Sequence, residues 1–306
     1  MNFSTIKNTL IKNKYGVYLF SFYHQLLKGK DEIEHIKYNL YTKRINNHSL
    51  QIRITELNQK AIEKNPTYYV IRWDNKTIGL MAHVCLHLAH IEYAAARGFI
   101  PVIDMQNSEN LFHETGEVGK INTWEFYFKQ PFRKLTEIEN KKVVYSSPRI
   151  APPSPDMQSV LNEEESFKWK MLYKNFFHFN DKTNNYVQQE YANLLKGKKV
   201  LGILYRGTDY KKLRTKNYPI VREINDFIDK IKALINERGD FDNIYVATEE
   251  KSAMEKLIEA FPDKIIVNKR VYYDDFENDF LANAHFNRER DKYLKGLEYL
   301  SSMYIL

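Results

Sequence analysis

The sequence predicts an α/β protein built on parallel sheets, and its pattern of apolar residues is the main reason. Short apolar runs alternate with longer segments whose apolar residues recur at helical spacing. Residues 199–267 repeat this alternation as strand, helix, strand, helix, strand, which is the order of half of a doubly wound fold. Residues 68–104 show the same alternation as one βαβ unit, for which a right-handed crossover is expected.

The first half of the chain begins with a polar stretch and continues with the βαβ unit. Residues 1–65 are charged and are expected to be helical. A strand is predicted at 68–73, where aromatic and β-branched residues dominate. The segment 80–97 has the apolar spacing of a helix, and Gly98 stands at the usual C-terminal position. Residues 100–104 form the second predicted strand.

The remaining elements are predicted by the same patterns. A proline-rich loop is expected at 149–155, and Pro219 is expected to begin a helix. The strand at 200–204 is short and apolar throughout, so it is expected to be buried. The full set comprises strands at 143–145, 199–205, 243–248 and 264–267, and helices at 161–177, 184–195, 220–237, 252–260 and from 287 to the end.

The composition favours a protein with a large core in a reducing compartment. The chain has 306 residues, 43% of them hydrophobic, which suffices for one large or two ordinary domains. Its single cysteine, Cys85, excludes an internal disulfide. The net charge of +7 favours anionic partners, although a solvated lysine-rich surface explains most of it. Nucleic acid is disfavoured as a partner because the basic residues are dispersed and no recognised nucleic-acid module occurs.

The hydropathy of the chain predicts a cytoplasmic protein. No stretch reaches the roughly 20 apolar residues of a transmembrane helix, and the start lacks the pattern of a signal peptide. Residues 5–30 leave two interpretations open. A packed or partner-binding helix is favoured, and the alternative is a basic amphipathic helix at the inner face of a membrane.

The first candidate site is the stretch 199–210, K-V-L-G-I-L-Y-R-G-T-D-Y. An apolar strand ends there in Arg206, and ligands of open α/β sheets bind at the carboxyl ends of strands. A guanidinium is always charged and offers a fixed fork of donors, which suits a phosphate or pyrophosphate. Asp209 is placed to hold Arg206 or to contact a sugar hydroxyl. The alternative is an ordinary ion pair between these two residues.

This stretch resembles the first motif of the fucosyltransferase superfamily, which includes α1,2-, α1,6- and protein O-fucosyltransferases. That motif commonly reads H-x-R-R-x-D. The resemblance places Arg206 on the arginine that contacts the donor pyrophosphate, and Asp209 on the aspartate. Two residues depart from the pattern: Leu204 stands where the family often has histidine, and Gly207 replaces the second arginine.

A second motif follows the first in the order that the resemblance predicts. Residues 244–250, I-Y-V-A-T-E-E, resemble a family segment of the form F-L-A-T-D-D. The resemblance implies that Thr248 and Glu249 lie beside the nucleotide. The alternative is a threonine at a strand end that only caps the next helix.

The second candidate site is the stretch 122–131, N-T-W-E-F-Y-F-K-Q-P. Asn122 or Thr123 is expected to cap a short helix with Glu125 in its first turn. Its aromatic residues admit two interpretations, a packed helix that covers a sheet or a surface that stacks on sugar rings. The W-E-x-x-F-x-x-P pattern resembles a segment of α1,6-type fucosyltransferases. This resemblance implies Glu125 as a catalytic or acceptor-orienting carboxylate and Trp124 as an acceptor-binding aromatic.

Three histidines of the helix at 80–97 admit two interpretations. His83 and His87 are one turn apart and His90 follows, a spacing compatible with zinc. A metal site is disfavoured because no third ligand is evident nearby. The resemblance places the start of this helix at the cleft, where His83 is expected to contact donor phosphate or an acceptor hydroxyl. The acidic residues at 274–279 are likewise read as a mobile cleft loop rather than a metal site.

The resemblance covers residues 67–306 and implies a GT-B-like fold, in which two Rossmann-like domains face a cleft. The expected divisions are a helical extension at 1–65, an acceptor-side domain at 66–190 and a donor-binding domain at 191–306. Residues 297–306 resemble the helix that precedes the family's third motif. Since the sequence ends there, the donor domain is expected to be incomplete, and activity is left open.

We therefore expect a glycosyltransferase that transfers fucose or a related sugar, with inversion, from a GDP-sugar to a hydroxyl of a bacterial surface glycan. No metal is expected, because an arginine takes its role at the pyrophosphate. Two alternatives stay open: a transferase that uses another nucleotide sugar, and a truncated, non-catalytic nucleotide-binding or interaction protein. The expected site residues are Arg206 and Glu125 for catalysis, Arg206, Asp209, Thr248, Glu249 and His83 for the donor, and Trp124 for the acceptor.

Overall fold

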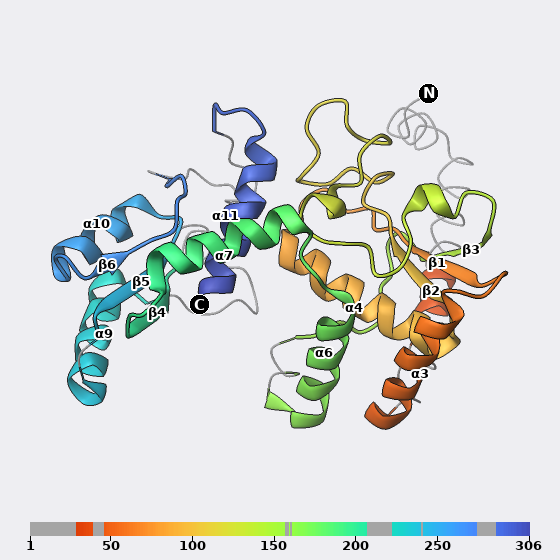
Figure 1. Ribbon diagram of the computed structural model, residues 1–306, viewed down its shortest axis with the longest axis horizontal. Coiled ribbons are helices and arrows are strands. Elements are labelled where there is room, and N and C mark those ends of the chain that lie inside the picture. Colours follow the sequence, from red (N-terminus) through yellow and green to blue (C-terminus); the bar gives the residue numbers. More distant parts are fainter. Residues whose placement is uncertain are drawn as a thin grey trace, which may run out of the picture. The chain divides into compact units, whose positions relative to one another are not determined.

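The computed structural model describes residues 29–38, 46–156, 159, 161–206, 222–239, 241–273 and 286–306. The chain forms two compact units, and both are discontinuous in sequence. The first unit takes its described residues from 1–75, 81–108 and 130–178, and the second from 76–80, 109–129 and 179–306. Each unit contains its own parallel three-stranded sheet (Figure 1). This confirms the predicted α/β class with parallel sheets.

The first unit is built on a sheet with strand order β2-β1-β3. Its strands are β1 Thr67–Ile71, β2 Ile100–Ile103 and β3 Lys142–Tyr145. β1 is the central strand and is buried from its second residue to its last. α4 Leu80–Arg97 connects β1 to β2. It stops at Gly98, whose φ of +65° is the left-handed conformation that glycine adopts without steric cost. The predicted βαβ unit and its glycine stop are confirmed.

Asparagine caps begin the two long flanking helices of the first unit. Asn46 accepts a hydrogen bond from the backbone of Ser49 at 2.8 Å, and Asn162 accepts one from Glu165 at 2.9 Å. Helical structure in the described part of 1–65 and a helix near 161–177 are thereby confirmed. These helical segments are residues 29–38, α3 Asn47–Lys60, the 3₁₀ turn η2 Leu135–Glu137 and α6 Glu163–Phe176.

The second unit is built on a sheet with strand order β4-β5-β6. Its elements alternate as β4 Val200–Leu204, α9 Ile224–Arg238, β5 Asn243–Ala247, α10 Lys251–Ala260 and β6 Ile265–Ile266. This confirms the predicted strand, helix, strand, helix, strand order. One hydrophobic cluster joins the two helices to the sheet through residues such as Ile228, Leu257, Ile203 and Val246. Both helices therefore cover one face of this sheet.

The prediction that β4 is a buried strand is wrong. β4 is an edge strand of its sheet, and Leu204 at its carboxyl end is 65% exposed. β5 lies between two partners and is the buried strand, with Ile244 through Ala247 all inaccessible. An apolar run does not reveal which strand of a sheet is central, since strand order depends on the crossovers and not on local sequence.

The other face of this sheet lies against the C-terminal helix. α7 Asp181–Leu195 and α11 Asp291–Ile305 pack on each other. Tyr245 of β5 donates a hydrogen bond to Asn268 at 3.2 Å, and Ser302 of α11 donates to the same oxygen at 3.2 Å. Gly202 of β4 leaves room for Leu306, which a side chain at this position would crowd. The sheet is therefore covered on both faces, as expected of a doubly wound arrangement.

The segment 109–129 belongs to the second unit although it precedes most of it in sequence. It contains the 3₁₀ turn η1 Thr123–Phe126. The division into units thus differs from the contiguous domains expected at 66–190 and 191–306. Among the described residues, no helix combines the length and the apolar character required to cross a bilayer.

Candidate functional site

The carboxyl edge of the second sheet holds three of the predicted donor-binding residues. Leu204 and Ala247 pair at the ends of β4 and β5, and Tyr205 donates a backbone hydrogen bond to Ala247 at 3.0 Å. Thr248 follows β5 directly, and Arg206 follows Tyr205 at the end of β4. Arg206 is half-buried, whereas Thr248 is buried and accepts a hydrogen bond from the backbone of Glu250 at 3.2 Å. The structure therefore brings Arg206, Thr248 and Glu249 to one sheet edge.

An arginine that the motifs did not identify completes this edge. Arg270, which follows β6, lies with Nη2 3.3 Å from Oε1 of Glu249. Its Nη1 donates to Ser302 at 3.4 Å, and its side chain is only 6% exposed. The backbone N–H of Tyr273 donates to the backbone carbonyl oxygen of Glu249 at 2.8 Å. The available signal was a predicted strand, 264–267, that is followed within three residues by a basic residue.

α10 begins at the same edge with Glu250 as its N-cap. Its first turn contains Lys251 and no acidic residue, and its N-terminal N–H groups carry a partial positive charge, although the N-cap carboxylate of Glu250 offsets part of that charge. Asp209, the remaining predicted donor-binding residue of this strand end, lies outside the described residues. Together, the guanidinium of Arg206 and the start of α10 can bind a phosphate or pyrophosphate at the sheet edge.

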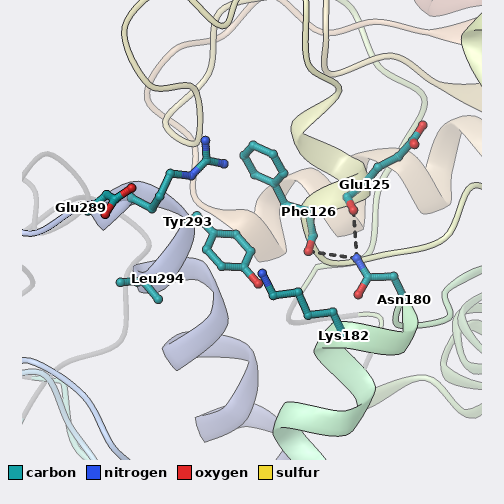
Figure 2. A pocket seen from close by; sticks show the side chains of 8 residues that line it. Glu125, Phe126, Asn180, Lys182, Glu289, Tyr293 and Leu294 are labelled. Atoms are coloured by element: carbon teal, nitrogen blue, oxygen red, sulfur yellow. Dashed lines mark hydrogen bonds between the residues drawn. The ribbon is translucent and has the colours of Figure 1, made fainter.

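Glu125 lies at a pocket of about 530 Å³ within the second unit (Figure 2). Three helical segments meet there: the end of η1 and the beginnings of α7 and α11. The pocket is lined by Glu125, Phe126, Asn180, Lys182, Glu289, Arg290, Tyr293 and Leu294, and we call it the Glu125 pocket.

Asn180 fixes two of these helical segments to each other. Its amide nitrogen donates to the carbonyl oxygens of Glu125 at 2.9 Å and Phe126 at 3.0 Å (Figure 2). Its side-chain oxygen caps α7 by accepting from the backbone of Thr183 at 2.8 Å. Asn122 caps η1 in the same way, with Trp124 as the donor at 3.3 Å, which confirms the predicted cap. One asparagine thus sets where Glu125 stands relative to α7.

The start of α11 is held by a second set of contacts. Arg290 has a φ of 58°, an uncommon value for a residue other than glycine. Its guanidinium lies 4.9 Å from the ring centre of Phe126, and Nη1 is 2.5 Å from Oε1 of Glu117. Lys292 donates to the carbonyl oxygen of His113 at 2.6 Å. These contacts tie α11 to the segment 109–129.

Trp124, the predicted acceptor-binding aromatic, is fully buried inside the second unit. Its ring stacks on Phe128, with centres 4.3 Å apart, and Nε1 donates to the carbonyl oxygen of Lys129 at 3.2 Å. This burial favours the packed interpretation of the aromatic stretch, and acceptor binding by Trp124 stays a prediction. Phe126, another aromatic residue of this stretch, is half-buried and lines the pocket.

His83 belongs to α4 in the first unit, where it is buried together with His87 and His90. Burial lowers the pKa of His83 to about 4, so the imidazole is neutral at pH 7. His90 is likewise neutral and lies 2.9 Å from the hydroxyl of Tyr69. Within the described ranges, no three His, Cys, Asp or Glu side chains are grouped to hold a metal ion. A role for His83 in donor binding stays a prediction.

The first unit has a pocket of its own, of about 600 Å³. Glu92 of α4 is almost fully buried there, with Oε1 3.3 Å from the Nζ of Lys168. Lys168 also contacts Glu165 at 2.8 Å and lies 4.3 Å from the ring centre of Trp169. Burial raises the pKa of Glu92 to about 7, and Lys168 offsets part of that rise. The sequence offered no motif for this group.

No protein-family model matches the chain, and no curated protein matches it. Solved structures with similar folds include the α-1,6-fucosyltransferase NodZ soaked with GDP-fucose, at 12% identity, with 78% of this chain and 85% of NodZ covered and a TM-score of 0.46. The fucosyltransferase NodZ from Bradyrhizobium matches at 12% identity, 79% and 86% coverage and a TM-score of 0.46. A variant of Arabidopsis thaliana FUT1 in complex with GDP matches at 11% identity, 89% and 71% coverage and a TM-score of 0.42. At these identities and TM-scores the likeness assigns neither a family nor an activity.

Proposed function

We propose that the chain is a glycosyltransferase that transfers fucose or a related sugar from a GDP-sugar to a hydroxyl of a bacterial surface glycan, with inversion. The observation that carries the proposal is the position of Arg206. It leaves β4 beside the end of β5, at the sheet edge where α10 begins. This is where open α/β sheets bind ligands, and the guanidinium suits a pyrophosphate. The motif around Arg206 and the motif around Thr248 support the same choice of donor.

In this proposal Arg206 stabilises the leaving group. Negative charge builds on the nucleoside diphosphate as the bond to the sugar breaks, and a guanidinium fixed at the pyrophosphate stabilises that charge. The start of α10 adds to this effect. Thr248 and Glu249 would contact the nucleoside, with Arg270 holding the carboxylate of Glu249 in place. No metal is required, because the arginine supplies the positive charge.

Glu125 would act on the acceptor in the same proposal. A carboxylate within hydrogen-bond reach of the acceptor hydroxyl can orient it and accept its proton during attack. Attack from the face opposite to the leaving group inverts the anomeric centre. The backbone of Glu125 is held by Asn180, so the carboxylate is presented from a fixed point. The reaction would take place in the cytoplasm, at the inner face of the membrane where surface glycans are assembled.

The test is calorimetric titration of the full chain with GDP, with UDP as the control nucleotide, in the presence and absence of EDTA. We expect GDP to bind selectively and independently of EDTA. Arg206→Ala should weaken GDP binding at least tenfold, about 1.4 kcal/mol. Arg238→Ala, at the exposed end of α9, is the matched control and should leave binding unchanged. Equal loss in both variants, or no selectivity for GDP, would refute the assignment of the donor site.

A further inference from the structure

Tyr293 places a buried hydroxyl without a partner at the Glu125 pocket. The residue is only 8% exposed, and its hydroxyl oxygen has no hydrogen-bond partner in the described part of the chain. A buried hydroxyl that makes no hydrogen bond costs about 1–3 kcal/mol. Phenylalanine would supply the same ring without this cost. The hydroxyl is therefore a feature that folding of this unit does not explain.

Lys182 lies over the same ring. Its Nζ is 4.8 Å from the ring centre of Tyr293, and Figure 2 shows both side chains among those that line the pocket. Lys182 is exposed and forms no ion pair with another described residue. The neighbouring carboxylate, Asp181, is instead 2.7 Å from Lys129. An ammonium group that can turn on a flexible stem thus stands beside the partnerless hydroxyl.

The other groups of the pocket restrict the class of ligand. The carboxylate of Glu289 accepts hydrogen bonds, Lys182 donates them and the Tyr293 hydroxyl does both, whereas the Glu125 carboxylate points away from Phe126, Lys182 and Tyr293 (Figure 2). The charge of Arg290 is already balanced by Glu117. Charges of both signs disfavour a strongly ionic ligand, and their number disfavours an apolar one. A neutral molecule with several hydroxyl groups matches this mixture.

One wall of the pocket is aromatic. Phe126 is half-buried and meets the ring of Tyr293 edge-on, with centres 5.6 Å apart. A pyranose ring has a hydrophobic C–H face as well as hydroxyl groups at its rim. The pocket offers an aromatic surface for the C–H face and hydrogen-bonding groups for the hydroxyl groups. Its volume of about 530 Å³ lies in the range of small-molecule sites.

The pocket is held open by contacts that do not involve its ligand-binding groups. Asn180 fixes the backbone of Glu125 and Phe126, and the hydroxyl of Tyr127 donates to the carbonyl oxygen of Tyr293 at 2.9 Å. Both contacts use backbone atoms of the lining residues and do not occupy the side chains of Phe126 and Tyr293. Such preorganisation lowers the ordering cost of binding.

We propose that the Glu125 pocket binds a pyranose ring of the acceptor glycan. The Tyr293 hydroxyl and the Lys182 ammonium group hydrogen-bond to hydroxyls of the ring, and Phe126 packs on its C–H face. This proposal rests on the proposed function, because it assigns the pocket to the acceptor of that reaction. It adds two residues that no motif identified, Lys182 and Tyr293, and it selects Phe126 from the aromatic residues of 122–131 as the one that contacts the sugar.

The test is saturation-transfer NMR of the full chain with methyl glycosides of glucose, galactose, mannose and N-acetylglucosamine. We expect at least one glycoside to bind, and Tyr293→Phe and Lys182→Met to weaken its binding at least fivefold. The matched controls are Tyr191→Phe and Lys196→Met, both exposed residues of α7 or its end, and these should bind as the native chain does. Binding of none of the glycosides, or equal binding by all variants, would overturn the proposal.

Two further measurements distinguish failure of the acceptor pocket from a structural role of Tyr293 and from failure of the proposed donor site. Tyr293→Phe removes a hydroxyl without a partner, so the variant should be at least as stable as the native chain in urea. A large loss of stability would show that the hydroxyl has a structural role, and the proposal would fail. GDP titration of the same samples reports the donor site independently. Loss of glycoside binding with intact GDP binding assigns the effect to the acceptor pocket alone.

Discussion

Tyr127 donates a hydrogen bond to the carbonyl oxygen of Tyr293 at 2.9 Å, and the two rings stack with centres 5.6 Å apart and planes 8° apart. Tyr127 is fully buried and belongs to the segment 109–129, whereas Tyr293 lies in the first turn of α11. Gly296, one turn further along α11, gives the phenol of Tyr127 its space. This contact positions the helix that carries Tyr293 to the Glu125 pocket.

Gly296→Ala should destabilise the second unit. A Cβ at this position would overlap the phenol of Tyr127, which is enclosed and cannot move without shifting α11. We expect the free energy of unfolding to fall by about 2 kcal/mol, as in other overpacked cores. Urea denaturation measures this change. Gly79→Ala is the control, since nothing lies within 4 Å of a Cβ there, and it should change stability by less than about 0.5 kcal/mol. Equal stability of both variants would contradict the packing described here.

Two substitutions should separate the two roles of Asn180, which caps α7 and donates to the backbone of Glu125 and Phe126. Asn180→Asp keeps the oxygen that caps α7 but loses the amide donor to Glu125 and Phe126. We expect it to bind the acceptor glycoside at least fivefold more weakly, because its carboxylate repels the two carbonyl oxygens and displaces η1. Asn180→Ala loses the cap as well and should cost about 1 kcal/mol more in stability. Glycoside titration and urea denaturation of both variants measure the two effects. Native-like binding by Asn180→Asp would argue against the role of Asn180 in placing Glu125.

Glu92 should make the first unit less stable as the pH rises. Its pKa is raised from 4.5 to about 7, chiefly by burial, so the native state keeps a proton that the unfolded chain releases between these values. The free energy of unfolding therefore falls as the pH rises from 4.5 to 7, and the loss persists above pH 7. Glu92→Gln removes this loss and should be more stable than the native chain at pH 8 by roughly 3 kcal/mol, with no gain at pH 4.5. Urea denaturation across this range tests it, and a gain that does not depend on pH would contradict the assignment.

The buried histidines should have the opposite effect on acid stability. Burial lowers the pKa of His90 from 6.5 to about 3, so the unfolded chain binds a proton between these values that the native state excludes. The contribution of neutral His90 to the free energy of unfolding is fully present above pH 6.5 and is lost as the pH falls towards 3. His90→Gln keeps a group that can bond to Tyr69 and does not titrate. Its stability should decline less steeply than that of the native chain from pH 6 to pH 4, and an unchanged slope would show that His90 does not contribute.

Most elements of the fold could be predicted because each has a local signal. The helical spacing of 80–97 and the stop at Gly98 depend only on neighbouring residues, and both were confirmed. The exposure of β4 could not be predicted, because it depends on which strands pair. The grouping of 109–129 with the second unit also has no local signal, since it arises from contacts with α11.

The candidate site could be predicted where residues follow strands. Arg206 and Thr248 stand within two residues of the ends of β4 and β5, so the topology of a parallel sheet brings them to one edge. Arg270 comes four residues after the end of β6 and lay outside any motif. Phe126, Lys182 and Tyr293 could not be found this way, because they come from η1, α7 and α11, which are distant in sequence.

The discontinuity of the second unit also determines when its pocket can form during synthesis of the protein. Tyr127 and Tyr293 are 166 residues apart, and their hydrogen bond joins the η1 segment to α11. The η1 segment leaves the ribosome long before α11, so until then it lacks the helix against which it packs. Tyr127 and Phe128 are buried in the folded protein. Until α11 has been synthesised they remain exposed in the nascent chain, where other chains or chaperones can bind them. The Glu125 pocket therefore cannot form before α11 has been synthesised.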